Sequence, residues 1–260
     1  MDDPRIHLVE ENLLSQFEIL ADSGHVTRLP DEDVVAFRRD LPFPLFNAIS
    51  GARFAPGTAG ERTRELVAGY LERGNGLLWW ATPSTMPPEA DVALRSLGIH
   101  PSPEPGMHRT MAGEVDSGRT PPGLAIVETE VDEVLADVLA EGFGFPAFVV
   151  EPMRAAMASI SSGVLFHVLA TLDGRPVGGG SGFLSGPDRR TLGIYNITTL
   201  DSARRQGIGR AVTAELMRLG RERGCTDAVL MASQLGRPTY ERLGFVEVCQ
   251  TPQYVWAPST

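Results

Sequence analysis

Hydrophobic positions recur along the chain with two different periods, one typical of helices and one typical of strands. The helical period predicts helices over residues 8–20, 31–39, 58–73, 89–97, 131–140, 153–160 and 208–219. Runs of apolar and β-branched residues predict strands over residues 43–50, 77–81, 124–128, 165–172, 176–184, 192–200 and 227–233. This mixture of helices and strands predicts an α/β (α+β) fold built on mixed sheets.

One stretch combines glycine and arginine where a predicted strand turns into a predicted helix. It is Arg204-Arg-Gln-Gly-Ile-Gly-Arg-Ala211, which we call the 204–211 loop. Gly207 and Gly209 carry no side chain to block a ligand, and glycine tolerates unusual backbone angles. The first amides of a helix have no acceptor within the helix, and that end carries about half a positive charge. The loop therefore predicts an anion site suited to a pyrophosphate.

Two other phosphate-binding patterns do not fit this loop. The Walker pattern needs Gly-Lys-Ser/Thr, and the chain contains no lysine. The dinucleotide pattern Gly-x-Gly-x-x-Gly fails because residue 212 is Val. What remains, Arg-x-x-Gly-x-Gly after a strand, resembles the acetyl-CoA loop of the GNAT superfamily of N-acetyltransferases. The segment Pro238–Val248, with Tyr240 and Leu-Gly-Phe, resembles the closing motif of that family. The resemblance covers residues from about 123 to 257.

The resemblance implies acetyl-CoA as the cosubstrate and assigns residues to bind it. The central strand would hold the pantetheine arm through its backbone, and an amide near Thr199 or Leu200 would polarise the thioester carbonyl. Ser233 replaces the Asn of many relatives, and its shorter side chain leaves the contact with pantetheine open. The expected cofactor-binding residues are Ile197, Thr198, Thr199, Arg204, Arg205, Gln206, Gly207, Ile208, Gly209, Arg210, Ala211 and Ser233.

Tyr240 is the residue that the resemblance assigns to protonation of the departing thiolate. A phenol titrates near pH 10 and a thiol near pH 8.5, so a tyrosine can donate to a developing thiolate. Tyr240 lies between Ser233 and Gly244 at the spacing of the family's tyrosine. A packed tyrosine with a satisfied hydroxyl is the structural alternative. His167 lies within a predicted strand, and we interpret it as a packed histidine rather than a general base.

The general base and the acceptor pocket are less clearly marked. In the family, the region corresponding to residues 141–152, which here interrupts a helical pattern, lines the acceptor pocket. Its phenylalanines suggest an apolar floor, although they fit a packed core equally well, and its two glutamates would attract a cation. Each glutamate is also a candidate base, with a solvated surface carboxylate as the alternative. The expected substrate-binding residues are Glu141, Phe143, Phe145 and Glu151.

The first half of the chain repeats the order of elements found in the second. The matched segments are 47–50 with 196–199, 72–74 with 222–224, 77–82 with 228–233, and 95–99 with 241–245. The offset stays between 146 and 151 residues, which indicates an internal duplication. Two unrelated segments with the same generic order are the alternative.

The two copies differ where the chemistry is expected. The first has Ala55-Pro-Gly-Thr-Ala-Gly-Glu-Arg62 in place of the 204–211 loop, and Glu61 would repel phosphate. Its last helix carries Val92 where the second carries Tyr240. We therefore predict two tandem GNAT-like mixed-sheet domains. The predicted division is a degenerate domain at 1–112, a linker at 113–122 and a catalytic domain at 123–260.

Composition narrows the partners and the location. The net charge of −10 disfavours nucleic acid and anionic membranes as partners. The two cysteines lack neighbours that would complete a metal site, so no metal is expected. No apolar run approaches a membrane span, and the first residues do not resemble a signal peptide, so we expect a cytoplasmic protein. The sequence does not indicate an oligomeric state.

The function expected is transfer of an acetyl group from acetyl-CoA to a primary amine of a small molecule or amino acid. The amine would attack the thioester directly. One alternative is a module that binds acyl-CoA without turnover, which the unidentified base favours and Tyr240 disfavours. A second alternative is a peptide or protein N-acetyltransferase. The sequence indicates neither the acceptor amine nor a preferred acyl chain.

Overall fold

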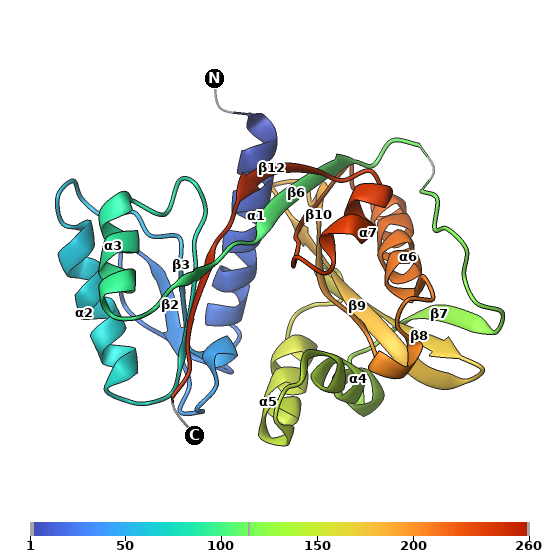
Figure 1. Ribbon diagram of the computed structural model, residues 1–260, viewed down its shortest axis with the longest axis horizontal. Coiled ribbons are helices and arrows are strands. Elements are labelled where there is room, and N and C mark those ends of the chain that lie inside the picture. Colours follow the sequence, from blue (N-terminus) through green and yellow to red (C-terminus); the bar gives the residue numbers. More distant parts are fainter. Residues whose placement is uncertain (1–2, 114, 259–260) are drawn as a thin grey trace. The chain divides into compact units, whose positions relative to one another are not determined.

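The computed structural model describes residues 3–113 and 115–258, which form two compact units (Figure 1). The C-terminal unit contains the residues up to Leu13 together with Gly106–Val248. The N-terminal unit contains Leu14–Pro105 together with the residues from Cys249 onward. Helix α1 (Pro4–Ala21) therefore contributes residues to both units.

The C-terminal unit is built on a seven-stranded mixed sheet with helices α4 (Glu133–Phe143), α5 (Ala147–Ala158), α6 (Ile208–Glu222) and α7 (Arg237–Arg242). Across the sheet the strands are β12 (Val246–Gln250), β6 (Pro105–Thr110), β11 (Asp227–Met231), β10 (Thr191–Thr199), β9 (Arg175–Ser185), β8 (Leu165–Leu172) and β7 (Leu124–Thr129). β10 and β11 run parallel on either side of the α6 connection, whereas β7, β8, β9 and β10 form an antiparallel meander.

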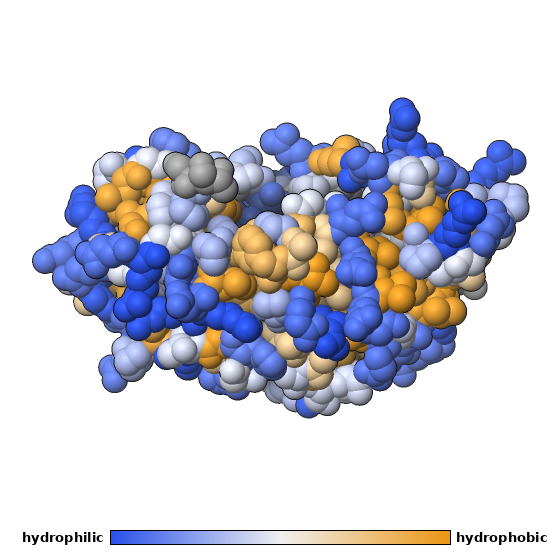
Figure 2. All heavy atoms as spheres, turned by 90° about the horizontal axis from the view of Figure 1, so that it is seen from below, coloured by the Kyte–Doolittle hydropathy of each residue, from blue (hydrophilic) through white to orange (hydrophobic). Residues whose placement is uncertain are grey.

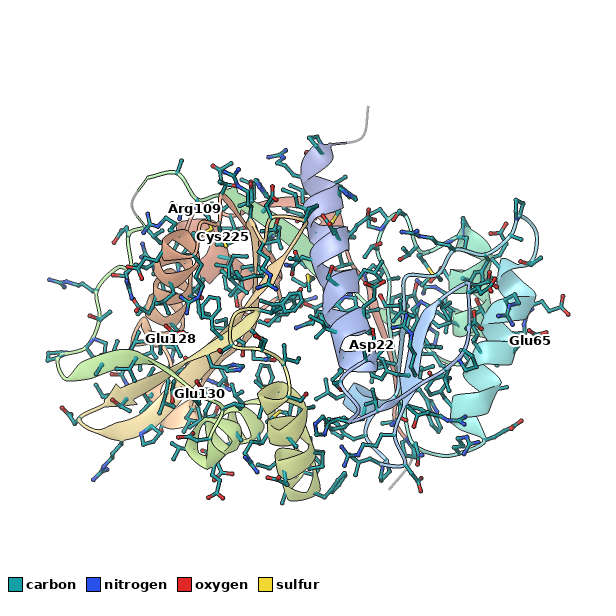
Figure 3. All side chains as sticks on the ribbon, turned by 180° about the vertical axis from the view of Figure 1, so that it is seen from behind. Asp22, Glu65, Arg109, Glu128, Glu130 and Cys225 are labelled. Atoms are coloured by element: carbon teal, nitrogen blue, oxygen red, sulfur yellow. The ribbon has the colours of Figure 1, made fainter. Side chains whose placement is uncertain are left out.

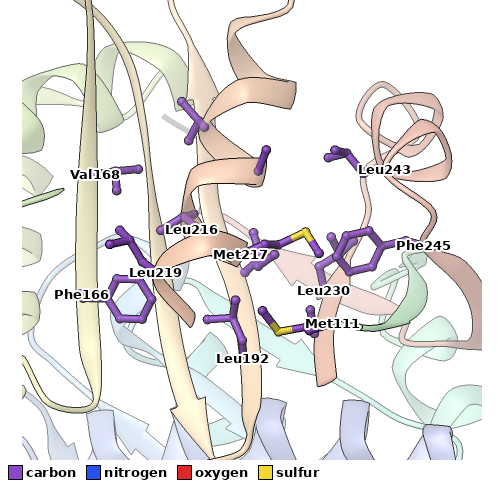
Figure 4. Packing of buried hydrophobic residues seen from close by; sticks show 14 of the residues in the cluster. Met111, Phe166, Val168, Leu192, Leu216, Met217, Leu219, Leu230, Leu243 and Phe245 are labelled. Carbon is purple, nitrogen blue, oxygen red and sulfur yellow. The ribbon is translucent and has the colours of Figure 1, made fainter. Parts of the chain in front are cut away.

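Helix α6 packs its apolar stripe against this sheet (Figure 4). Val212 and Leu216 are fully buried, and each such side chain stabilises the fold by about 1.5–3 kcal/mol. Gly180 of β9 allows the helix to approach, because a Cβ there would lie 3.0 Å from Val212 and 3.1 Å from Leu216. The start of α6 is thus fixed against the sheet by its own core residues.

The N-terminal unit is built on a six-stranded sheet with helices α2 (Ala59–Leu71) and α3 (Pro88–Ser96) and a 3-10 turn, Pro44–Phe46. Its strands in order are β1 (Thr27–Arg28), β2 (Val35–Arg38), β3 (Ala48–Ser50), β4 (Leu77–Trp80), β13 (Gln253–Trp256) and β5 (Pro101–Ser102). The parallel pair β3–β4 flanks α2 as β10–β11 flanks α6.

The structure corrects three predicted elements. Residues 31–39 contain strand β2 rather than a helix, since Val35–Arg38 pairs with both β1 and β3. Residues 43–50 contain a 3-10 turn at Pro44–Phe46, and only Ala48–Ser50 is a strand. The predicted interruption at 141–152 is confined to Gly144–Pro146, because α4 continues to Phe143 and α5 begins at Ala147.

Two strands lie outside the half of the chain in which the linear division would place them. β6, which precedes residue 112, pairs antiparallel with β11 in the C-terminal sheet. β13, near the C-terminus, pairs antiparallel with β4 in the N-terminal sheet. The packing units therefore differ from the predicted linear boundaries at 112 and 123, because each sheet takes one strand from the other half.

No helix among the described residues is long and apolar enough to cross a bilayer. On the face drawn in Figure 2, hydrophobic patches are interrupted by hydrophilic residues.

Candidate functional site

The central strands of the C-terminal sheet separate at one end. β10 and β11 pair from Thr191/Asp227 only as far as Gly193/Val229, although β10 continues to Thr199. On its other side β10 pairs with β9, with an irregularity between Tyr195 and Thr198. Asn196, inside this irregularity, has a positive φ of 55°. The last residues of β10 therefore form an edge that β11 does not cover, as expected for a backbone that binds an extended ligand.

The 204–211 loop follows directly from this strand end. A 3-10 turn, Asp201–Ala203, leads into it, and Gly207 caps α6 with a φ of 83°, a conformation that glycine adopts readily. Ile208 is 1% exposed and Ala211 is 5% exposed, so these two residues offer backbone amides rather than side chains. The helix therefore begins at Gly207, where the sequence predicts an anion site.

Gly209 connects the strand end with the helix start. A Cβ on Gly209 would lie 3.6 Å from Oγ1 of Thr199 and 3.9 Å from the side chain of Ile197. Ile197 and Thr199, predicted to bind pantetheine, thus lie beside Gly209 of the loop predicted to bind pyrophosphate. The two arginines at the start of the loop differ in their contacts. Arg204 pairs with Asp201 at 2.8 Å and donates to the Thr199 carbonyl. Arg205 is exposed and has a φ of 64°.

One predicted backbone donor is already engaged. The amide of Leu200 donates to the carbonyl of Val177 at 2.8 Å. Leu200 therefore does not fit the role of polarising a thioester carbonyl. The prediction that an amide near Thr199 does so stays untested.

Tyr240 and Ser233 lie on and before the short helix α7. Tyr240 is half-buried, and its ring meets Phe245 edge-on at 6.2 Å between centroids. Ser233 is exposed, and its Oγ accepts the amide of Gly236 at 3.1 Å, which orders the turn into α7. Arg109 of β6 donates to the Leu243 carbonyl at the other end of this helix (Figure 3). Both ends of α7 are therefore held by hydrogen bonds.

The end of α4 lies against the irregular part of β10. A Cβ on Gly142 would fall 1.8 Å from Oγ1 of Thr198, so only glycine permits this approach. Phe143 and Phe145 follow and stack with their centroids 5.5 Å apart. Phe143 is 45% exposed, so it is not a core residue. The segment predicted to contact the acceptor thus begins beside the strand end.

The two glutamates of that segment differ in position. Glu141 is exposed on the last turn of α4, directly before Gly142. Glu151 lies on α5 and pairs with Arg154 at 2.7 Å, and the hydrogen bond from Arg154 lowers the pKa of Glu151. A lowered pKa makes Glu151 a weaker base, so Glu141 is the better placed of the two.

A chain of polar side chains crosses the sheet at the irregularity in β10, from buried His167 and Ser181 to exposed Asn196. Nδ1 of His167 lies 2.9 Å from Oγ of Ser181, which lies 3.2 Å from Nδ2 of Asn196. Burial lowers the pKa of His167 to about 4, so its imidazole is neutral at pH 7. This arrangement fits the interpretation of His167 as a packed histidine. The sequence analysis did not link Ser181 with Asn196, because their contact depends on strand register.

The residues between β6 and β7 also reach the loop, which the sequence analysis missed. Asp116 pairs with Arg210 in the first turn of α6 at 2.9 Å. The one sequence signal was Asp-Ser-Gly at 116–118, a combination typical of a tight turn. Among residues 3–113 and 115–258, no cluster of three or more His, Cys, Asp or Glu side chains could hold a metal ion.

Comparison with known proteins defines the class of this fold. A GCN5-related N-acetyltransferase from Kribbella flavida is 18% identical, with a TM-score of 0.69 and 96% of each chain covered. A tandem GNAT protein from the clavulanic acid biosynthesis pathway is 12% identical, with a TM-score of 0.60, 100% of this chain and 96% of that chain covered. A GCN5-related N-acetyltransferase from Sphaerobacter thermophilus is 16% identical, with a TM-score of 0.62, 87% of this chain and 76% of that chain covered. No curated protein matches the sequence.

The architecture is therefore that of two GNAT-like domains in tandem. Residues 137–245 match the model of the acetyltransferase (GNAT) family. That match covers α6, the 204–211 loop, β11 and α7.

Proposed function

We propose that the protein is an acetyl-CoA-dependent N-acetyltransferase acting on a primary amine of a small molecule or amino acid. The observation that carries the proposal is that the uncovered end of β10 lies next to the start of α6, with Ile197 and Thr199 beside Gly209. A thioester on an extended arm would lie along the strand, and its diphosphate would meet the helix amides. The family match supports acetyl transfer in general.

The reaction begins with a neutral amine beside the thioester carbonyl. The nitrogen lone pair forms a bond to the carbonyl carbon, and the carbon–sulfur bond then breaks. The departing thiolate takes the electron pair of that bond and a proton from the hydroxyl of Tyr240. The proton lost from nitrogen passes to Glu141 or to water, since Glu141 is exposed beside the end of β10.

The acceptor surface favours an amine that carries an apolar group. The Phe143–Phe145 stack and the half-exposed Phe148 supply apolar area, while Glu141 supplies a negative charge for an ammonium group. We infer that these residues, rather than Glu151, select the acceptor. Glu151 is engaged by Arg154 and serves α5.

Two measurements test this proposal. Calorimetry with CoA tests the cosubstrate, and thiol release from acetyl-CoA in the presence of a library of primary amines and short peptides tests turnover. The proposal expects CoA binding and release with at least one small amine. Binding without release by any amine or peptide would favour the non-catalytic acyl-CoA module. Release with peptides alone would favour a peptide acetyltransferase, and failure to bind CoA would exclude all three.

A further inference from the structure

A short segment of the connection between β6 and β7 lies on the 204–211 loop. We call Asp116–Arg119 the strap. The Arg119 carbonyl oxygen lies 2.6 Å from the position a Cβ on Gly207 would take. The Arg210 guanidinium donates two hydrogen bonds to Asp116 of the strap. Nη2 donates to the carboxylate at 2.9 Å, and Nε donates to the backbone carbonyl at 3.1 Å. The strap thus contacts a glycine and a cation at which a phosphate would bind.

The local structure of the strap is suited to this contact. The Gly118 amide donates to Oδ1 of Asp116 at 2.8 Å, which turns the chain tightly. Gly118 has a φ of 73°, and a Cβ there would lie 2.6 Å from Nη1 of Arg210. The backbone angle favours glycine, and a Cβ at Gly118 would displace the Arg210 guanidinium.

The contact between Asp116 and Arg210 neutralises a cation at the start of α6. The positive end of a helix is an unfavourable place for a cation such as Arg210 unless an anion lies nearby. Asp116 supplies this negative charge. The Gly118 amide, and then Arg210, lower the pKa of Asp116, so the carboxylate stays charged at pH 7.

The ion pair between Asp116 and Arg210 can also break easily. The Asp116 side chain is 84% exposed, against 22% for Arg210, so leaving the ion pair returns the carboxylate to water at little cost. A cavity of about 360 Å³ adjoins the strap, lined by Val115, Ser117 and Thr120 of the connection and by Ala211, Ala214 and Arg218 of α6. The strap is therefore not packed tightly along its length.

From these contacts we propose that Asp116 is a built-in competitor of the phosphate groups of acetyl-CoA for Arg210. In the free protein the strap holds the guanidinium, and a phosphate of the cosubstrate takes the place of the Asp116 carboxylate when it binds. The inference rests on the proposed function, because it assumes that CoA binds at the 204–211 loop. It follows that the Asp116 carboxylate weakens the affinity of the wild-type protein for CoA, and that a substitution removing its charge raises this affinity.

The main test compares CoA binding to wild type and to Asp116→Asn by calorimetry. Asparagine keeps the oxygen that accepts the Gly118 amide but removes the charge. We expect affinity to rise about two- to fivefold, the range set by an exposed ion pair, and the gain to shrink as salt is raised. Asp188→Asn, at an exposed position in the β9–β10 turn, removes the same charge elsewhere and should leave affinity unchanged.

A double variant makes the test specific to Arg210. In an Arg210→Gln background, CoA binds more weakly and Asp116→Asn no longer raises affinity. Repeating the titrations with 3′-dephospho-CoA distinguishes the phosphates: a gain that persists assigns the competition to the diphosphate, and a gain that disappears assigns it to the 3′-phosphate.

A second substitution tests the strap through its backbone conformation. Gly118→Ala places a Cβ against the guanidinium and should detach the strap, raising CoA affinity as Asp116→Asn does. Gly113→Ala is its control, since Gly113 has a similar φ of 81° but nothing within 4 Å of a Cβ.

The outcomes separate this inference from the proposed function. Normal CoA binding by wild type with equal or weaker binding by Asp116→Asn would overturn the inference alone. A gain in CoA affinity from Asp116→Asn that survives in the Arg210→Gln background would also overturn the inference alone. Failure of every variant to bind CoA would overturn the proposed function and the inference with it.

Discussion

The starts of α2 and α6 occupy the same place in their sheets and differ in chemistry. Each helix connects two parallel strands, and a glycine with positive φ lies just before each, Gly57 at 80° two residues before α2 and Gly207 at 83° directly before α6. Each also ends at a glycine, Gly74 or Gly224, whose amide bonds the carbonyl three residues earlier. The duplicated fold therefore survives in both units, and the difference in function lies in a few side chains.

The decisive difference is how each unit neutralises the arginine in the first turn. Arg62 of α2 pairs with Asp31 at 2.8 Å, Asp33 at 3.1 Å and Glu65 at 2.8 Å, and Glu65 lies on the outer side of the helix (Figure 3). These hydrogen bonds raise the pKa of Arg62 further. Arg210 of α6 has Asp116 as its carboxylate partner. We infer that the N-terminal helix start is permanently neutralised, whereas the C-terminal one can exchange its anion for a ligand.

The closing helices differ in the same way, and here the structure corrects the sequence comparison. The amide of Ile99 bonds the carbonyl of Leu94, as the amide of Phe245 bonds that of Tyr240. The counterpart of Tyr240 is therefore Leu94, which is fully buried, and not Val92, which is 61% exposed. The N-terminal unit has an apolar core residue where the C-terminal unit has a phenol.

The largest effect should come from giving the C-terminal loop the charge of the N-terminal one. Gly209 is the second residue of α6 and Glu61 is the third residue of α2, so both lie in the first turn of their helices. A Cβ on Gly209 has ordinary contacts without backbone strain. Gly209→Glu should therefore keep the fold while weakening CoA binding about 100-fold or more, since charge-assisted hydrogen bonds are lost and repulsion is added. Calorimetry measures the loss.

The reciprocal variant is the control. Glu61→Gly should not create a second CoA site, because Arg62 keeps its three carboxylate partners. Near-normal CoA affinity in Gly209→Glu would contradict the site assignment. A second equivalent of CoA bound by Glu61→Gly would contradict the comparison of the two units.

Removing one hydroxyl in each unit should affect turnover in the C-terminal unit and only stability in the N-terminal unit. Tyr240→Phe should keep the ring against Phe245 and most CoA affinity, yet lower kcat roughly 100- to 10,000-fold, the usual range for a general acid. Tyr70 in the N-terminal unit donates to the Phe37 and Ala48 carbonyls, so Tyr70→Phe should cost about 1 kcal/mol of stability and leave kcat unchanged. Steady-state kinetics and thermal unfolding measure the two outcomes. A Tyr240→Phe enzyme within threefold of wild type, with chemistry rate-limiting, would remove Tyr240 from the mechanism.

The remaining effects concern the pH dependence of stability, and they have opposite signs in the two units. Burial lowers the pKa of His167 to about 4, below its unfolded value of about 6.5, so the unfolded chain binds the proton more readily. Stability from neutral His167 is complete above pH 6.5 and falls by up to about 3 kcal/mol as pH drops to 4. Burial raises the pKa of Glu104 to about 7, so its contribution is present at low pH and is lost as pH rises from 4.5 to 7.

Denaturant unfolding between pH 4 and 7 should separate these contributions. His167→Gln should flatten the acid side of the stability profile, and Glu104→Gln should remove the decline on the neutral side. Exposed His100→Gln should change neither. Unchanged profiles in both variants would mean that burial does not set these two pKa values.

The sequence predicted the elements whose signals are local. The 204–211 loop, α6 and the β8–β9 hairpin turned at Asp173-Gly174 follow from glycine placement and short-range periodicity, and all are present. Contacts between residues far apart along the chain could not be predicted from the sequence. The exchange of β6 and β13, the approach of Gly142 to Thr198 and the pairing of Asp116 with Arg210 each join residues far apart in sequence.

The exchanged strand β13 also sets the order in which the chain can fold during synthesis. β4 pairs with β13 within the N-terminal sheet, but residues 253–256 leave the ribosome long after Leu77–Trp80. At synthesis rates of about 5–20 residues per second, this delay is on the order of ten seconds or more. Until then the edge of β4 is open, and the fully buried Trp79 lacks part of its cover. The N-terminal unit, although made first, is thus the one whose sheet is completed last.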